Sequence, residues 1–316
     1  SRPVGDAMAT TIWGASSSWT LTALPLFVWM GEILFRTKLS ENLFKGLAPW
    51  MQRLPGGLIH VNVVGCALFA AISGSSAATV ATVGKMSIPE LRKRKYPEKI
   101  LLGSLAGSGT LGLLIPPSII LIIYGVTVQE SIAKLFIAGI IPGIMIALIF
   151  MSYVIVWSLI NKKSMPKSLE NSSFIEKVKK SKQLMPIVLL ILSVIGSIYT
   201  GIATATEAAS LGVIGALVLS YFQKSLTKET FRASLLGATK TSCMIAFILA
   251  GATFLSLAMG FTGLPRNLAI WIQGMELSPY VLIFVLMIFY IILGMFLDGI
   301  SAVVLTMAII EPMIRQ

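Results

Sequence analysis

Long uncharged apolar stretches dominate the pattern of hydrophobic and polar positions along this chain. Each is longer than the roughly 18–20 residues that cross a lipid bilayer, and they lie at 7–31, 54–84, 100–129, 135–161, 183–206, 241–265 and 277–297. The stretches do not alternate polar and apolar residues, as the strands of a membrane β-barrel would. This pattern predicts an all-α polytopic membrane protein.

The composition supports that prediction. Of the 316 residues, 56% are hydrophobic and only 12% are charged, whereas a soluble chain carries about 25% charged residues. The net charge is +12, but the cations lie between the apolar stretches, so we do not expect nucleic acid as a partner. Cys66 and Cys243 are isolated within apolar stretches, so neither a disulfide nor a zinc site is expected.

The distribution of lysine and arginine predicts how the chain crosses the membrane. Segments 36–56, 85–99, 161–183 and 223–240 are rich in cations, whereas 125–134, 200–207 and 261–277 carry at most one each. The positive-inside rule places the first group in the cytoplasm and the second outside. The crossings then fall at 19–35, 100–125, 132–158, 184–203, 204–222 and 241–260, while 57–89 and 278–312 each return to the side they left.

A weak internal repeat spans the lysine-rich linker 161–183. The matched pairs are 39–43 with 264–268, Pro55 with Pro279, and 74–89 with 297–312. The first copy enters from the cytoplasm and the second from outside, which is the inverted-repeat build typical of secondary transporters. Chance similarity between apolar stretches is the alternative explanation.

Small hydroxylated residues interrupt the second apolar stretch at Ser73, Gly74, Ser75 and Ser76. The flanking arms, 57–73 and 75–89, are short for two full spans, so we expect a re-entrant hairpin with its tip at these residues. Irregular backbone at membrane depth occurs where it faces protein or a wet cavity. The tip could therefore bind an ion or substrate, or it could be a small-residue packing face between helices.

A discontinuous helix is expected at Gly109–Ser118. Pro116 and Pro117 lack N–H donors, so the carbonyls of Gly112 and Leu113 lose their helical partners. Such carbonyls, with hydroxyls such as that of Thr110, suit a hard cation such as Na⁺, and the N-terminus of the following helix suits a carboxylate. The alternative is a kinked helix whose loose carbonyls are bonded by Ser or Thr.

Three acidic residues lie within apolar stretches, where ionisable groups are expensive and often functional. Asp298 aligns with Ser75 in the repeat and is the best candidate for an ion ligand. Glu207 follows Thr204 and Thr206, so this group could bind a ligand or could cap a helix. Glu32 is expected to pair with Arg36, four residues later.

Six motifs together resemble the large membrane subunit of the tripartite ATP-independent periplasmic (TRAP) transporters. In chain order they are Pro55-Gly56-Gly57 with His60-Val61-Asn62, Ile72-Ser73-Gly74-Ser75, Leu114-Ile115-Pro116-Pro117-Ser118, Ala138-Gly139-Ile140-Ile141-Pro142-Gly143, Thr204-Ala205-Thr206-Glu207-Ala208 and Gly294-Met295-Phe296-Leu297-Asp298. The resemblance covers nearly the whole chain. It departs at Ala205, where the family usually has Pro. The family's second Pro-Pro break would follow Gln316 and a first helix would precede Ser1, so we expect a fragment that does not transport alone.

The resemblance implies an elevator-type importer in the bacterial or archaeal inner membrane, driven by Na⁺ and carrying small organic acids such as C4-dicarboxylates or sialic acid. It implies a periplasmic substrate-binding protein and a small four-helix membrane subunit as partners, and no cofactor besides the coupling ion. Residue by residue, it assigns substrate contacts to Ser73–Ser76 and Pro116–Ser118. It assigns Na⁺ contacts to Ser75, Gly109, Thr110, Gly112, Leu113, Asp298 and Gly299.

The expected organisation has a scaffold helix and surface segment at 1–56 and a first transport half at 57–130. Scaffold helices follow at 131–240, then a helix and surface segment at 241–277 and the start of a second transport half at 278–316. A proton-coupled carrier or channel for organic anions is the rival interpretation. A membrane-embedded enzyme is disfavoured, because the chain lacks HExxH and paired catalytic acids.

Overall fold

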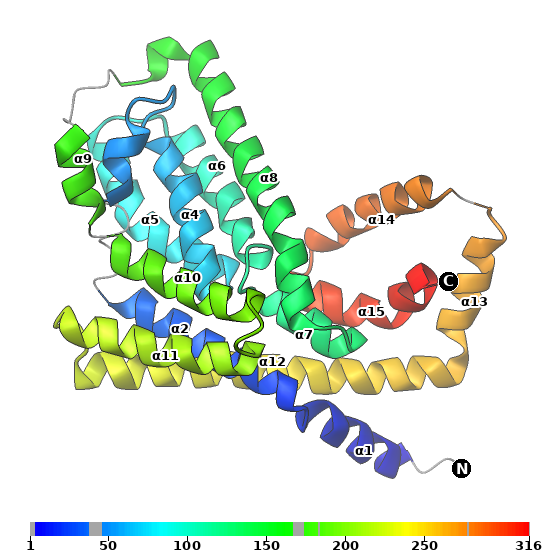
Figure 1. The fold of residues 1–316 in the computed structure, drawn as a ribbon. Helices are drawn as coiled ribbons and strands as arrows, with labels where there is room; N and C mark the ends of the chain where they lie inside the picture. The colour runs from blue at the N-terminus through cyan, green and yellow to red at the C-terminus, as the bar shows by residue number, and fades with distance from the viewer. Residues whose placement is uncertain (1–3, 38–45, 167–173, 183, 277, 316) are drawn as a thin grey trace.

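A computed structural model describes residues 4–37, 46–166, 174–182, 184–276 and 278–315, and over these residues the chain is helical with no strand (Figure 1). Segment 39–43, the first member of the proposed repeat, lies outside the described residues. Its counterpart, 264–268, lies in a helix. The prediction of an all-helical fold is confirmed.

The helices have the following bounds. They are α1 (Val4–Ser16), α2 (Ala23–Arg36), α4 (Ile59–Ser73), α5 (Ser76–Lys93), α6 (Glu98–Gly109), α7 (Ile119–Val128), α8 (Ile132–Ile160), α9 (Phe174–Ser181), α10 (Met185–Tyr199), α11 (Ala205–Phe222), α12 (Lys228–Thr262), α13 (Leu264–Gln273), α14 (Pro279–Gly294) and α15 (Gly299–Arg315). Short 3₁₀ turns lie at Trp19–Thr22, Thr110–Leu113 and Lys162–Ser164.

Several of these helices can cross a membrane. Helices α8, α11 and α12 are long and apolar enough, and the bent pairs α1–α2 and α9–α10 would bring the number to five within the described residues. Shorter apolar helices occur within α4, α7 and α14. Helix α4 lies where the sequence predicts a hairpin arm, and α7 follows the predicted break. Short helices are expected at both places, so their lengths agree with the prediction of a polytopic membrane protein.

Two charged segments are more helical than the sequence suggested. The stretch 223–240 was expected to be a cytoplasmic connection, but α12 already begins at Lys228, where the Thr227 hydroxyl accepts a hydrogen bond from the Thr230 N–H at 3.1 Å. The linker 161–183 contains α9, whose Ser181 hydroxyl accepts a 2.6 Å hydrogen bond from the indole N–H of Trp50. A local cap therefore starts α12 within the charged stretch, and a hydrogen bond ties the end of α9 to Trp50.

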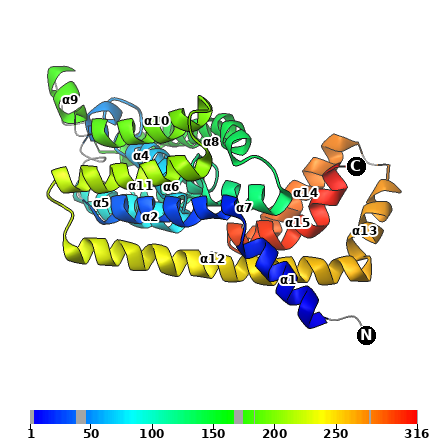
Figure 2. The same ribbon diagram turned by 60° about the horizontal axis from the view of Figure 1, so that its bottom comes forward.

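Helix α2 lies at the centre of the packing. It contacts α11 and α12, and the three run side by side in both views (Figures 1 and 2). Its inward side chains, among them Phe27, Ile33 and Leu34, are fully buried. In the last turns of α2, Arg36 Nε donates to Glu32 Oε2 at 2.8 Å and forms the salt bridge that the sequence predicted. This apolar packing forms a platform for the rest of the chain.

A second block stands across that platform. Helices α4, α5 and α6 pack against one another, α8 runs along them, and α4 and α7 contact α2 (Figure 1). From the platform, α12 runs past the block to α13, and the chain returns toward the block through α14 and α15 (Figure 1). Because α15 packs on α7, the two members of the proposed repeat meet at the broken helix.

Candidate functional site

The hairpin tip is formed by the predicted residues. Helix α4 ends at Ser73, and Gly74 follows with φ 57°, donating its N–H to the Ala70 carbonyl at 3.0 Å. Ser75 then begins α5 as an N-cap, its hydroxyl accepting from the Ala78 N–H at 3.4 Å. A left-handed glycine followed directly by a helix cap reverses the chain in two residues.

Hydrogen bonds within the tip fix its shape. The Ser73 and Thr79 hydroxyls are 2.8 Å apart, and the Thr79 hydroxyl donates to the Ser75 carbonyl at 2.7 Å. Ser73 and Thr79 are buried. Ser76, at the first position of α5, is half-buried. These hydrogen bonds hold the tip in one conformation.

The predicted break in the next helix is also present. Helix α6 ends at Gly109, a 3₁₀ turn covers Thr110–Leu113, and α7 begins only at Ile119. The buried Ser118 hydroxyl donates to the Leu113 carbonyl at 2.6 Å. The helix is thus discontinuous, and one of its two loosened carbonyls is satisfied by a serine, as the alternative interpretation proposed.

Glycines bring the hairpin tip and the break into contact. A Cβ atom added to Gly112 would lie 3.1 Å from the carbonyl oxygen of Ser75 and 3.1 Å from the N atom of Ser76. A Cβ atom added to Gly74 would lie 3.0 Å from the N atom of Ile119 and 3.2 Å from the carbonyl oxygen of Pro117. The two backbones therefore meet at a distance that only glycine allows.

This contact joins the N-termini of α5 and α7. Helix α5 begins at Ser76, which lies against Gly112, and α7 begins at Ile119, which lies against Gly74. We call this pair of close approaches the Gly74–Gly112 contact. The first N–H groups of a helix lack intrahelical partners, and the helix dipole makes this end electropositive. Two such ends beside one another favour a carboxylate.

Two glycines of α8 pack closely against the break. A Cβ atom at Gly139 would lie 2.8 Å from the Leu114 carbonyl oxygen, and one at Gly143 would lie 2.8 Å from Cγ1 of Ile115. Sequence reasoning assigned these glycines no role, although their spacing of four residues is the signal of a close-packed helix face.

Gly109 and Thr110 lie at the start of the break but serve different surroundings. Gly109 is buried against Val80 of α5, with an added Cβ 3.7 Å from the Ser76 carbonyl oxygen. Thr110 is exposed and donates its hydroxyl hydrogen to the Gly107 carbonyl at 2.7 Å. Gly109 therefore packs against α5 near the hairpin tip, whereas the Thr110 side chain lies on the exposed side of the break.

In the other member of the repeat, Gly299 packs against the same break, and Asp298 precedes it. Asp298 is exposed, and its Oδ2 accepts from the N–H groups of Ile300 and Ser301 at 3.1 and 3.3 Å. An added Cβ at Gly299 would lie 3.2 Å from Cδ1 of Leu113. Asp298 thus caps α15 just as Ser75 caps α5, at the aligned position of the repeat.

Thr204, Thr206 and Glu207 lie elsewhere. The Thr204 hydroxyl accepts from the Glu207 N–H at 3.3 Å, and Glu207 Oε2 accepts from the Thr204 N–H at 2.8 Å, which completes a capping box at the start of α11. Thr204 and Thr206 line a cavity of about 880 Å³ together with Thr127, Gln129 and other residues between α1, α7 and α11. Of the described residues that line this cavity, none belongs to the hairpin tip, so the structure does not bring this group to the Gly74–Gly112 contact.

Among the described residues, His60 and the acidic side chains do not gather into a metal site. The His60 ring is fully buried at the start of α4, with Nε2 2.8 Å from the Pro55 carbonyl oxygen. Over the described part of the chain, no three His, Cys, Asp or Glu side chains gather as a metal site. The oxygen atoms available at the break are instead carbonyls and hydroxyls.

Comparison with known proteins identifies the fold's family. The family model described as "Tripartite ATP-independent periplasmic transporter, DctM component" matches residues 2–316. The chain belongs to the DctM family of TRAP transporter large permeases. It is therefore a membrane transporter component and not an enzyme.

Curated relatives agree with this assignment. The C4-dicarboxylate TRAP transporter large permease of Pseudomonas aeruginosa is 32% identical over 96% of this chain and 70% of its own length. The sialic acid TRAP transporter large permease of Vibrio cholerae is 32% identical over 95% of this chain and 70% of its own length. The 2,3-diketo-L-gulonate TRAP transporter large permease of Escherichia coli is 30% identical over 98% and 72%, respectively.

Proposed function

We propose that this permease imports small organic acids together with Na⁺. The observation that carries the proposal is the contact between the Ser73–Ser76 tip and the Gly109–Ser118 break. There, two helix N-termini lie beside carbonyls and hydroxyls that have left regular helical bonding. Helix N-termini suit the carboxylate, and the oxygens suit a hard cation.

The substrate class follows from that chemistry and from the relatives. The relatives named above carry C4-dicarboxylates, sialic acid and 2,3-diketo-L-gulonate, according to their names. Such acids share a carboxylate. We propose contacts from Ser73–Ser76 and Pro116–Ser118, because these residues surround the paired helix ends.

Sodium completes the electrostatics of this proposal. An organic anion is costly in apolar surroundings unless charge or dipoles compensate it. A first ion would use oxygens of Ser75, Gly109, Gly112 and Leu113, with the Ser118 hydroxyl giving up its 2.6 Å bond to the Leu113 carbonyl. Thr110 is left out of this set, because it is exposed and its hydroxyl is bonded to the Gly107 carbonyl. A second would use Asp298 and Gly299, because Asp298 carries a carboxylate and the next residue, Gly299, packs against Leu113 of the break. If substrate affinity requires these ions, the Na⁺ gradient drives uptake.

The fold supports an elevator movement in this proposal. The block of α4–α7 would carry the site, and α2, α11 and α12 would form the fixed platform in the inner membrane of a bacterium or archaeon. A periplasmic substrate-binding protein would deliver the acid, and a small membrane subunit would brace the platform. One relative is named "Isethionate TRAP transporter permease protein DctMQ", which is in keeping with a second permease part.

Uptake measurements test the proposal. The complete transporter is reconstituted in proteoliposomes, and candidate organic acids are offered with their binding protein in an inward Na⁺ gradient, a K⁺ gradient or a pH gradient alone. We expect uptake only with Na⁺ and the binding protein. Uptake with the pH gradient alone would instead identify a proton-coupled carrier, and downhill flux without any gradient would identify a channel.

A further inference from the structure

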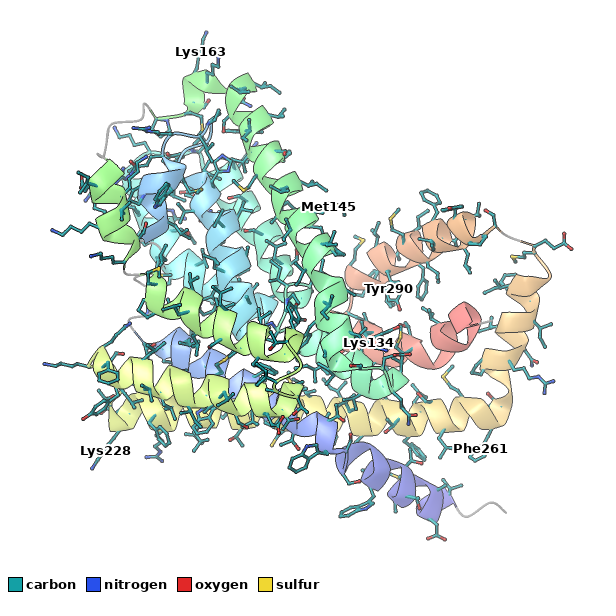
Figure 3. All side chains as sticks on the ribbon, in the orientation of Figure 1. Lys134, Met145, Lys163, Lys228, Phe261 and Tyr290 are labelled. Atoms are coloured by element: carbon teal, nitrogen blue, oxygen red, sulfur yellow. The ribbon has the colours of Figure 1, made fainter. Side chains whose placement is uncertain are left out.

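A second large cavity lies at the lysine-rich end of the molecule. Its volume is about 960 Å³, and three segments line it: the turn at 54–58, the α5–α6 connection at 93–96, and the end of α8 with the residues that follow it. Lys163, next to this cavity, marks this end of α8 in Figure 3, opposite Lys134. The cation-rich loops place this end at the cytoplasmic face.

The lining is strongly basic. Lys93, Lys95 and Lys162 line the cavity, and within the described part of the chain none of them forms a salt bridge. Arg94 also lines it, but its Nε atom bonds Glu90 at 2.7 Å, so this pair is internally neutral. The cavity therefore presents three uncompensated ammonium groups, which favour an anion.

Two hydroxyl groups add directional contacts. The Ser158 side chain is only 4% exposed, and its Oγ lines the cavity without a hydrogen-bond partner. The Tyr96 hydroxyl oxygen accepts from the Leu58 N–H at 3.1 Å, which leaves its own hydrogen to donate. Burial raises the pKa of Tyr96, so the phenol remains a donor at physiological pH. Both groups suit acceptor oxygens of a bound anion.

Glycine at position 56 lies directly against the buried serine hydroxyl. Gly56 has φ 104°, and an added Cβ would lie 3.1 Å from the Ser158 Oγ and 2.6 Å from Cγ1 of Val154. A larger residue would therefore clash with Val154 and crowd the hydroxyl. The buried, unpartnered oxygen and the left-handed glycine beside it belong to one built pocket.

One wall of the cavity is apolar and continues outward along α8. Leu159 lines the cavity and is 47% exposed, and Val156 and Ile160 on the same helix are exposed as well. Trp157, Tyr96 and Met165 pack against the buried cluster of Ile59, Ile100 and Val154 near this wall. Aromatic side chains of this kind mark the headgroup level of a membrane.

We propose that this cavity binds the phosphate headgroup of an anionic phospholipid of the cytoplasmic leaflet, with its acyl chains along the exposed face of α8. Basic pockets beside transmembrane helices on the cytoplasmic side are suited to such headgroups. A free phosphate ion shares the polar contacts but gains nothing from the apolar wall. This assignment needs only the membrane placement of the chain and not the proposed transport cycle.

Lipid binding to the purified transporter tests the proposal. Native mass spectrometry compares retention of dioleoylphosphatidylglycerol with retention of dioleoylphosphatidylcholine, with and without excess sodium phosphate. We expect a preference for phosphatidylglycerol that phosphate does not abolish. Equal retention of both lipids, or full displacement by free phosphate, would overturn the proposal.

Matched variants locate the binding. Each lysine near an anionic headgroup contributes about fivefold in affinity, so K93Q/K95Q/K162Q should lose about a hundredfold. The control K228Q/R232Q/K240Q removes three cations from exposed positions of α12 and should retain the lipid. Equal losses in both variants would show a diffuse charge effect and overturn the site.

A second variant guards against misfolding of the triple substitution. Ser158→Ala removes a buried hydroxyl that has no partner, so the thermal unfolding temperature should not fall. Phosphatidylglycerol retention should fall about tenfold, the value of one hydrogen bond to a charged group. Unchanged retention in this stable variant would count against the pocket.

Discussion

At the scale of single residues, glycine positions decide whether the hairpin tip can reach the break. Gly74 and Gly112 sit where added Cβ atoms would press on backbone atoms of Ile119 and Ser75. Backbone atoms cannot move aside as the end of a flexible side chain can. The site therefore depends on the absence of a Cβ atom at these two positions, which lets the serine and proline residues of the tip and the break come together.

Gly74→Ala should destabilise the tip. The alanine must keep φ near 57°, which costs about 1–2 kcal/mol, and its Cβ must also push back Ile119. Thermal unfolding in detergent should shift downward, and transport should fall more steeply than expression. Gly103→Ala is the control: nothing lies within 4 Å of its added Cβ, so it should stabilise α6 by about 0.8–1 kcal/mol. Equal behaviour of the two variants would contradict the proposed close approach.

Asp298→Asn separates the charge of this residue from its structural contact. Asparagine caps a helix about as well as aspartate, so the bonds to the Ile300 and Ser301 N–H groups should persist. We expect normal expression and melting, but a raised Na⁺ concentration for half-maximal uptake in proteoliposomes. A normal Na⁺ response would show that Asp298 is only a helix cap.

At the scale of elements, the site is the meeting of two interrupted segments. The sequence predicted the hairpin tip and the break well, because Gly-Ser and Pro-Pro act locally on the backbone. It could not predict that Gly139 and Gly143 of α8 hold the break in place, since that contact joins residues distant in sequence. It also did not predict that α12 begins as early as Lys228. The lysine and arginine residues there indicated a cytoplasmic connection, whereas the Thr227 cap starts a helix.

The Pro116→Ala/Pro117→Ala double variant tests the break. Restored N–H groups could bond the carbonyls of Gly112 and Leu113 and continue the helix. We expect a folded protein with at least tenfold lower Na⁺-dependent uptake, as the loosened oxygens are removed from the site. Pro142→Ala, within α8, is the control and should transport far better. Wild-type uptake by the double variant would show that the break is a passive kink.

At the scale of the whole molecule, the two members of the repeat meet at one place. Helix α5 contacts the break through Ser75 and Ser76, and α15 contacts it through Gly299 beside Asp298. Sequence alignment alone paired Ser75 with Asp298, and both prove to be the residue that caps its helix. That Ser75 lies against Gly112 and Gly299 against Leu113, so that both caps lie at the same break, could be found only from the folded chain.

The central claim is that the tip and the break together hold an organic anion with Na⁺. Ser76→Cys in a background without Cys66 and Cys243 places a reactive thiol at the first position of α5, and its alkylation rate is measured with Na⁺, the organic acid, both or neither. Lys228→Cys, at the exposed start of α12, provides the control thiol. We predict that Na⁺ and the acid together slow alkylation at position 76 alone, whereas each by itself has little effect. The same rate under all four conditions would contradict the claim.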